Sequence, residues 1–243
     1  MKFFTIFLIL IVYLSHSQEQ STFKVTYDYI LKKEKIIKNF KKKNKTSNPN
    51  LIKKSLELFI KSKPTEAFLY FNDSLSYYDV VERITIENNN YNKIDPSYAF
   101  AGRNLKIFNE IKNDFVIEYQ EESNFENIDE FLVKHPCNTY KIRRETKKIN
   151  GFSCVLATTK DKSGRKVNIW FTPEINTSFG PQRFCGLPGL VIFIDAYAYT
   201  ATLKEIKKIK NKQIEQYPKN IKFIDTNTLK KLSNESYNKI FKN

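Results

Sequence analysis

Alternation of apolar and polar residues runs through most of the chain from residue 65 onward, which is typical of half-buried strands. Asn72 to Ser74 separates two such segments, 66–72 and 75–82, and predicts a hairpin turn. Asn150-Gly151 joins 139–149 to 152–160, and an Asn-Gly pair in this setting is a strong signal for a β-hairpin. We expect further strands at 23–29, 105–109, 114–120, 129–134, 166–172, 191–197 and 200–207.

Helical spacing occurs in two places. Asn48 and Pro49 fit the cap and first turn of a helix at 49–62, whose apolar residues share one face. A second helix is expected at about 228–241, with Leu232, Tyr237 and Ile240 directed at the sheet. The lysine-rich stretch 32–45 fits either a helix on a membrane surface or a solvated insertion. These patterns predict an α+β, mostly β chain: a single large curved antiparallel sheet, a meander or partly open barrel, with one inserted helix and one C-terminal helix.

The first 17 residues have the pattern of a signal peptide. Lys2 precedes an apolar run over 3–14, and Ser15-His16-Ser17 offers small residues for cleavage. A run of about 12 residues is shorter than the roughly 20 that a spanning helix needs, although a retained anchor is the alternative. We therefore expect residues 1–17 to be removed and 18–243 to form one exported domain, in the periplasm, associated with the outer membrane of a Gram-negative envelope, or secreted. No transmembrane segment is expected in the mature chain.

Charge adds a second indication about partners. The chain has 41 lysines and arginines against 26 acidic residues, a formal net charge of +15. In the cytoplasm such an excess would favour nucleic acid, but export argues against that partner. Peripheral contact with an anionic membrane or lipopolysaccharide is one interpretation. Scattered lysines that only solvate the surface of a lysine- and asparagine-rich chain are the other.

Three cysteines remain after cleavage: Cys137, Cys154 and Cys185. An odd number in an oxidising compartment predicts one disulfide and one free thiol, or three thiols. We predict a Cys154–Cys185 disulfide with Cys137 free, because Cys154 lies on the strand that enters the region of Cys185. Cys137–Cys154 is the alternative.

Few residues point to catalysis. His135 is the single histidine outside the signal peptide, and it precedes Cys137 by two positions. A nucleophile and its base usually meet across a fold, so this spacing is weak evidence for a Cys-His pair. Neither a phosphate-binding glycine loop nor a Gly-x-Ser-x-Gly elbow occurs. We predict no catalytic, metal or cofactor residues, and an enzyme is the less favoured interpretation. Paired carboxylates for glycoside chemistry would escape a single sequence, so a cell-envelope hydrolase stays an alternative.

The segment 173–189 is the most informative part of the chain. Connections longer than about 12–15 residues are uncommon and often functional. Gly180-Pro181 predicts one turn, and Pro188-Gly189 has the residues of the two centres of a type II turn. Five of the six glycines lie between residues 151 and 189, so conformational freedom is concentrated here.

This segment also resembles a known family. Trp170 to Ile175 (WFTPEI), Phe179-Gly180-Pro181 and Gly186 to Val191 (GLPGLV) resemble the signature of the GLPGLI family of exported bacterial proteins, with valine for the last isoleucine. Residues 145–154 and 157–159 are similar to the family pattern as well. The resemblance implies a single GLPGLI-type β-rich domain. Because the family has no established activity, it implies no catalytic or binding residues.

Two roles are open for the motif. It is either a shaped loop whose Leu187, Leu190 and Phe184 plug one end of the sheet over Trp170, or an exposed ledge where Phe179, Phe184 and Leu187 meet a partner. The candidate residues are Trp170, Phe179, Gly180, Pro181, Phe184, Gly186, Leu187, Pro188, Gly189 and Leu190. The function favoured is a non-catalytic binding or accessory module for an envelope protein or peptide. A carrier with an apolar ligand in a curved-sheet cavity is the main alternative, and it would require an unfilled apolar interior.

Overall fold

The computed structural model of the chain describes residues 21–43, 49–81, 95–121, 125, 128–210 and 212–241. The predicted signal peptide lies outside these residues. In chain order the elements are β1 (Thr22–Leu31), α2 (Lys33–Lys43), α3 (Pro49–Lys61), β2 (Thr65–Phe71), β3 (Leu75–Val80), α4 (Pro96–Ala101), β4 (Leu105–Glu110), β5 (Phe115–Gln120), β6 (Phe131–Pro136), β7 (Lys141–Ile149), β8 (Phe152–Lys160), β9 (Lys166–Thr172), β10 (Leu190–Asp195), β11 (Tyr199–Ile209) and α5 (Thr226–Phe241).

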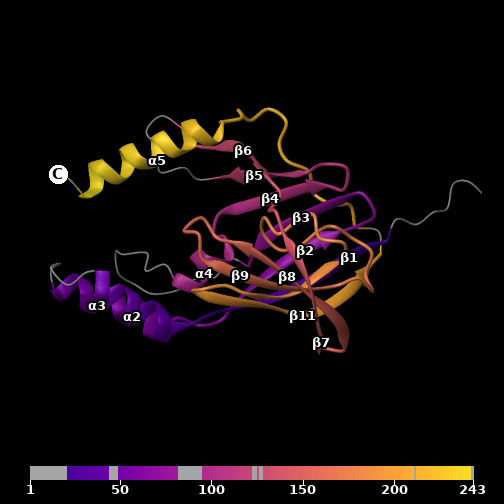
Figure 1. Cartoon of the computed structure of the whole chain (residues 1–243). Helices are drawn as coiled ribbons and strands as arrows, with labels where there is room; N and C mark the ends of the chain where they lie inside the picture. Colours follow the sequence, from indigo (N-terminus) through magenta and orange to yellow (C-terminus); the bar gives the residue numbers. More distant parts are fainter. Residues whose placement is uncertain are drawn as a thin grey trace, which may run out of the picture.

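In this part of the chain, eleven strands form one antiparallel sheet in the order β6-β5-β4-β3-β2-β1-β11-β10-β9-β8-β7 (Figure 1). The chain starts at the centre with β1, runs outward to the edge strand β6, and crosses to the opposite edge at β7. Pro136 and Lys141 are five residues apart, a separation that spans at most about 18 Å. The two edges therefore come close at this end without closing the sheet. The predicted mostly β architecture with one curved antiparallel sheet is confirmed.

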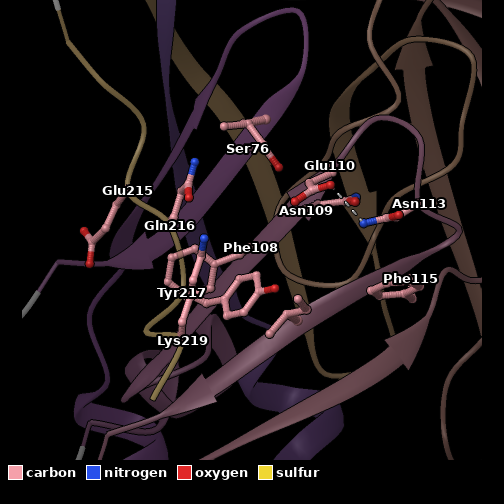
Figure 2. A pocket seen from close by; sticks show the side chains of 12 residues that line it. Ser76, Phe108, Asn109, Glu110, Asn113, Phe115, Glu215, Gln216, Tyr217 and Lys219 are labelled. Carbon is pink, nitrogen blue, oxygen red and sulfur yellow. Dashed lines mark hydrogen bonds between the residues drawn. The ribbon is translucent and has the colours of Figure 1, made fainter. Parts of the chain in front are cut away.

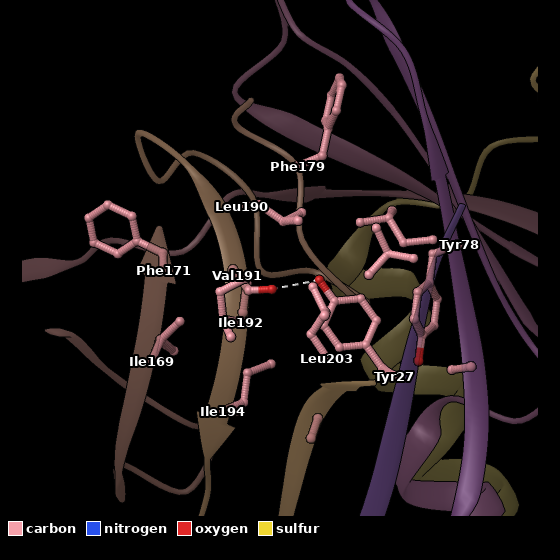
Figure 3. Packing of buried hydrophobic residues seen from close by; sticks show 14 of the residues in the cluster. Tyr27, Tyr78, Ile169, Phe171, Phe179, Leu190, Val191, Ile192, Ile194 and Leu203 are labelled. Atoms are coloured by element: carbon pink, nitrogen blue, oxygen red, sulfur yellow. Dashed lines mark hydrogen bonds between the residues drawn. The ribbon is translucent and has the colours of Figure 1, made fainter. Parts of the chain in front are cut away.

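The main core lies on one face of the sheet, which we call the inner face. Figure 3 shows Tyr27 of β1 and Tyr78 of β3 across from Ile169 of β9 and Ile194 of β10. The Tyr27 hydroxyl donates a hydrogen bond of 2.7 Å to the Val191 carbonyl, which satisfies the polar end of a fully buried ring. Side chains fill this layer, whereas the carrier alternative requires an unfilled apolar interior.

A second cluster lies on the outer face, where residues 212–221 cover β3 to β5. Its buried members are Tyr77, Phe108, Ile117, Leu132 and Ile214. The chain then reaches the β6 edge, where the Ile224 amide donates to the Leu132 carbonyl at 2.8 Å. In α5, Leu229 and Leu232 pack on the cluster around Phe131. The side chains of Tyr237 and Ile240, which we also expected at the sheet, lie outside the described residues.

The predicted inserted helix is present as α3, and the basic stretch 32–45 forms α2, which packs on it through Phe40 and Phe59, 5.9 Å apart. The short helix α4 was not expected. The Asp95 side chain caps it by accepting from the Ser97 amide at 2.9 Å, and Gly102 ends it with φ +102°. None of the described helices is long and apolar enough to cross a bilayer.

Candidate functional site

The long segment 173–189 lies against the inner core. Phe179 and Leu187 are 1% and 2% exposed, and Leu190 is fully buried. The Phe179 ring lies 6.3 Å from that of Phe71 on β2. The burial of Leu187 and Leu190 is that expected of a plug, whereas Phe184, the third residue of the expected plug, stays partly exposed. The ledge of Phe179, Phe184 and Leu187 does not form, because Phe179 and Leu187 are buried.

Two glycines of the motif are required by close backbone contacts. A Cβ on Gly180 would lie 2.1 Å from the Phe184 carbonyl oxygen, and one on Gly189 would lie 2.1 Å from that of Thr172. Gly189 has φ +150°, so the expected positive φ is found. Its amide, however, donates to the Leu187 carbonyl at 2.9 Å, which closes a three-residue turn around Pro188 in place of the expected type II turn.

The disulfide joins Cys137 to Cys185, with Cα atoms 5.3 Å apart. Cys154 is a free thiol, fully buried on β8. The predicted Cys154–Cys185 pairing is therefore wrong. The prediction relied on the strand that carries Cys154 toward the region of Cys185, whereas the connection from β6 to β7 brings Cys137 next to the loop. The bond also removes Cys137 as a nucleophile for His135.

Residues 182–185 of the loop are fixed at several points. Arg183 donates to Glu118 of β5 through Nε at 2.7 Å and through a second guanidinium nitrogen. The Asn138 amide donates to the Arg183 carbonyl at 3.2 Å, and Gln182 donates to the Phe100 carbonyl at 2.7 Å. Together with the disulfide, these contacts tie the loop to β5, to the β6–β7 connection and to α4.

His135 lies beside this ion pair. Its Nε2 is 3.5 Å from Glu118 Oε2, beyond a normal hydrogen bond, and the residue is 9% exposed. Burial lowers the pKa of His135 to about 4, helped by the Arg183 and Lys162 cations and partly opposed by Glu118. The imidazole is therefore neutral near pH 7.

This environment predicts a pH-dependent stability. An unfolded histidine titrates near 6.5, so between pH 6.5 and about 4 the unfolded chain binds the extra proton and the folded chain does not. The free energy of unfolding should therefore fall by up to about 3 kcal/mol as the pH drops from 6.5 to about 4. Urea unfolding across this range should show a flatter profile for His135→Gln than for the wild type. Parallel profiles would mean that His135 does not titrate in this way.

Beside the fixed loop lies an open hollow of about 540 Å³, which we call the loop pocket. Its walls come from α4, the β8–β9 turn, residues 182–184 and the β10–β11 turn. Its aromatic and charged lining comprises Phe100, Phe184, Tyr197, Tyr199, Lys160, Asp161, Lys162, Arg165 and Arg183. Of the candidate residues from the sequence, only Phe184 lines it.

The β8–β9 turn holds its charged residues in place. One Asp161 carboxylate oxygen accepts from the Ser163 and Arg165 amides at 2.8 and 2.9 Å, and the other accepts from Arg165 Nε at 2.8 Å. Burial pushes the pKa of Asp161 up, but these hydrogen bonds outweigh it and lower that pKa. The Arg165 guanidinium lies 4.5 Å from the centre of the Tyr197 ring, a cation–π contact.

The β10–β11 turn is anchored by Lys32, the residue that follows β1. Lys32 pairs with Asp195 and donates through Nζ to the Ala196 carbonyl at 2.6 Å. The Ala196 amide donates to the Tyr199 carbonyl at 3.0 Å. The Tyr199 ring lies 5.8 Å from that of Phe100, so an aromatic floor joins two distant segments.

A smaller hollow of about 130 Å³ lies on the outer face between β3–β5 and residues 215–219. Figure 2 shows the rings of Phe108 and Tyr217 at its centre and Glu215 and Glu110 toward its two sides. It has about a quarter of the volume of the loop pocket (130 against 540 Å³), and we regard the loop pocket as the principal candidate. Among the described residues, no group of three or more His, Cys, Asp or Glu is placed to hold a metal ion.

The open antiparallel sheet, the fixed loop and the pocket define a β-rich fold with a preformed hollow on its surface. Residues 84–231, more than half of the chain, match the family model described as N-glycanase peptide, N-terminal domain, and the chain belongs to this family. No curated protein matches the chain. The GLPGLI-type resemblance stays a prediction.

Two solved structures of PNGF-II, in different space groups, are similar to this chain. Their TM-scores are 0.54 and 0.53, each at 17% identity over 89% of this chain. The chain spans about a third of their length (33% and 34%). At this identity the likeness shows the fold alone.

Proposed function

We propose that this chain is a glycan-binding accessory domain outside the cytoplasm, which holds a glycan or glycan-bearing peptide in the loop pocket without cleaving it. The family is named for an N-glycanase peptide, which makes a glycan the ligand to consider first. The observation that carries the proposal is the lining of the loop pocket, which combines partly exposed aromatic rings with charged groups. The disulfide is consistent with an oxidising compartment.

The lining fits the chemistry of sugars. A sugar ring has apolar C–H faces and a rim of hydroxyls, so it suits a site with aromatic rings and convergent polar groups. Tyr197 and Phe184 offer the rings, whereas Arg165 and Asp161 offer a donor fork and an acceptor. Hydrogen bonds to charged groups are the stronger ones. Because the loop and both turns are already fixed, binding orders few side chains and loses little entropy.

The same lining favours binding over glycoside hydrolysis. Glycoside hydrolysis generally uses two carboxyl groups on either side of the bond. Among the described residues that line the pocket, Asp161 is the one carboxylate, and Arg165 holds it. Glu118 nearby is engaged by Arg183.

Calorimetric titration with a purified N-glycopeptide tests the proposal. We expect saturable binding that Tyr197→Ala weakens at least about tenfold, which corresponds to about 1.4 kcal/mol. Tyr217→Ala, which removes a ring beside the outer hollow, is the matched control and should bind as the wild type does. Absence of binding by the wild type, or equal losses in the two variants, would contradict a glycan site in this pocket. Binding of the deglycosylated peptide alone would instead favour the plain peptide partner.

A further inference from the structure

The edge strand β7 is the most exposed strand of the sheet. Every residue from Lys141 to Lys148 is exposed, on both faces of the strand. β7 pairs with β8 alone, and Figure 1 shows it at the margin of the sheet. Five of its nine residues are cations, against the single acid Glu145: Lys141, Arg143, Arg144, Lys147 and Lys148. In the described part of the chain, none of these five forms an ion pair.

The two arginines lie in an irregularity of the strand. Ile142 pairs with Ala157 and Thr146 with Val155, so residues 143–145 stand opposite the single residue Leu156. Such a bulge directs extra side chains away from the ladder. The chain has only six arginines among its 41 cations, and two of them are adjacent here. General solvation of the surface relies on lysine, whereas arginine is suited to bidentate binding of carboxylate, sulfate or phosphate.

The cationic strand begins at the loop pocket. Asn138 and Thr159 both line that pocket. The Thr159 hydroxyl donates to the Thr139 carbonyl at 2.8 Å, and Lys141 pairs with Thr158 in the ladder. At about 3.3 Å per residue, the strand leads the positive charges roughly 20 Å away from the pocket rim. A chain-like ligand seated in the pocket can therefore continue along β7.

We propose that the glycans bound by this domain are anionic, and that β7 binds the carboxylate, sulfate or phosphate groups of the sugars that extend from the loop pocket. This inference rests on the proposed function of the pocket. Charged residues on edge strands also prevent unwanted strand pairing. That role requires charge alone. Two adjacent arginines that form no ion pair, in a bulge beside a pocket, are instead placed to contact a ligand.

The test compares one glycan in two forms, neutral and sialylated, which differ in carboxylate charge. We expect the wild type to bind the sialylated form at least about tenfold more tightly at low salt, with the preference shrinking as salt screens the charges. Arg143→Gln/Arg144→Gln should reduce the preference to about twofold or less and leave affinity for the neutral form unchanged. The control, Lys230→Gln/Lys231→Gln on α5, removes the same charge at exposed positions and should keep the preference.

The outcomes separate this inference from the function of the pocket. Equal affinity of the wild type for the two forms would overturn the inference while leaving the pocket function intact. Failure to bind either form would overturn both. If the double variant self-associates and still prefers the sialylated form, β7 protects the sheet edge and the inference is wrong. The inference is also wrong if the arginine substitutions weaken only binding to vesicles of anionic lipid and leave the affinity for both glycans unchanged.

Discussion

Replacing Gly189 with alanine should lower the free energy of unfolding by about 3–5 kcal/mol. The new Cβ would lie 2.1 Å from the Thr172 carbonyl oxygen and 2.6 Å from its carbon, so backbone must move against backbone. The residue would also have to keep φ at +150°, which side chains rarely adopt. Backbone strain and overpacking each typically cost about 1–3 kcal/mol.

Gly164→Ala is the matched control for this prediction. Gly164 also has positive φ, at +75°, but nothing lies within 4 Å of a Cβ added there. Gly164→Ala should therefore lower the free energy of unfolding only by the cost of the left-handed conformation, about 1–2 kcal/mol. Urea unfolding of both variants measures the difference. Equal losses would show that close contact at Gly189 is unimportant and that the loop is not a packed part of the fold.

Removing the disulfide should have an effect of similar size. Cys137 and Cys185 are 48 residues apart, and a crosslink of that span stabilises by about 4 kcal/mol through the unfolded chain. Cys137→Ala should therefore melt well below the wild type and be unaffected by reductant. Cys154→Ala leaves the bond intact, so its melting temperature should still drop when reductant is added.

The same pair of variants decides between the two pairings of Cys185. If Cys154 were its partner, Cys154→Ala would be insensitive to reductant and Cys137→Ala would respond to it. That pattern would contradict the connection past the loop that the structure shows.

The strands could be predicted because their alternation is local. The hairpins at Asn72 to Ser74 and at Asn150-Gly151 both fall where the turn residues place them. The helix α3 begins at Pro49 as its capping residues indicate. By contrast, α4 spans only six residues, too short for a helical period, and its caps at Asp95 and Gly102 were the one available signal.

The loop pocket could not be predicted, because it exists only in three dimensions. Phe100, Asp161 and Tyr197 come from three turns or helix ends far apart in the chain, and each is unremarkable in its own sequence context. The partner of Cys185 was predicted wrongly for the same reason, because the disulfide depends on the crossing from β6 to β7. The motif was recognised as special, but its pattern could not show that Phe179 and Leu187 point into the core while Arg183 and Phe184 face the pocket.

The loop and the pocket are parts of one arrangement. The glycines let residues 173–189 pack against the core, and the ion pair with Glu118 and the disulfide fix residues 183–185. What remains exposed is a preformed pocket whose rings and charges need little ordering before a ligand binds. The segment 173–189 thus supports the pocket and supplies only one edge of it.

The most direct test is to locate the glycan-binding site by NMR. A ¹⁵N-labelled chain would be titrated with an N-glycopeptide while the backbone amides are followed. We expect saturable shifts at Phe100, at residues 182–184 and at residues 161–165 and 197–199, and no shift of the amides around Tyr217 in the outer hollow. Shifts centred on the outer hollow, or no shifts with glycopeptide in excess, would contradict a glycan site in the loop pocket.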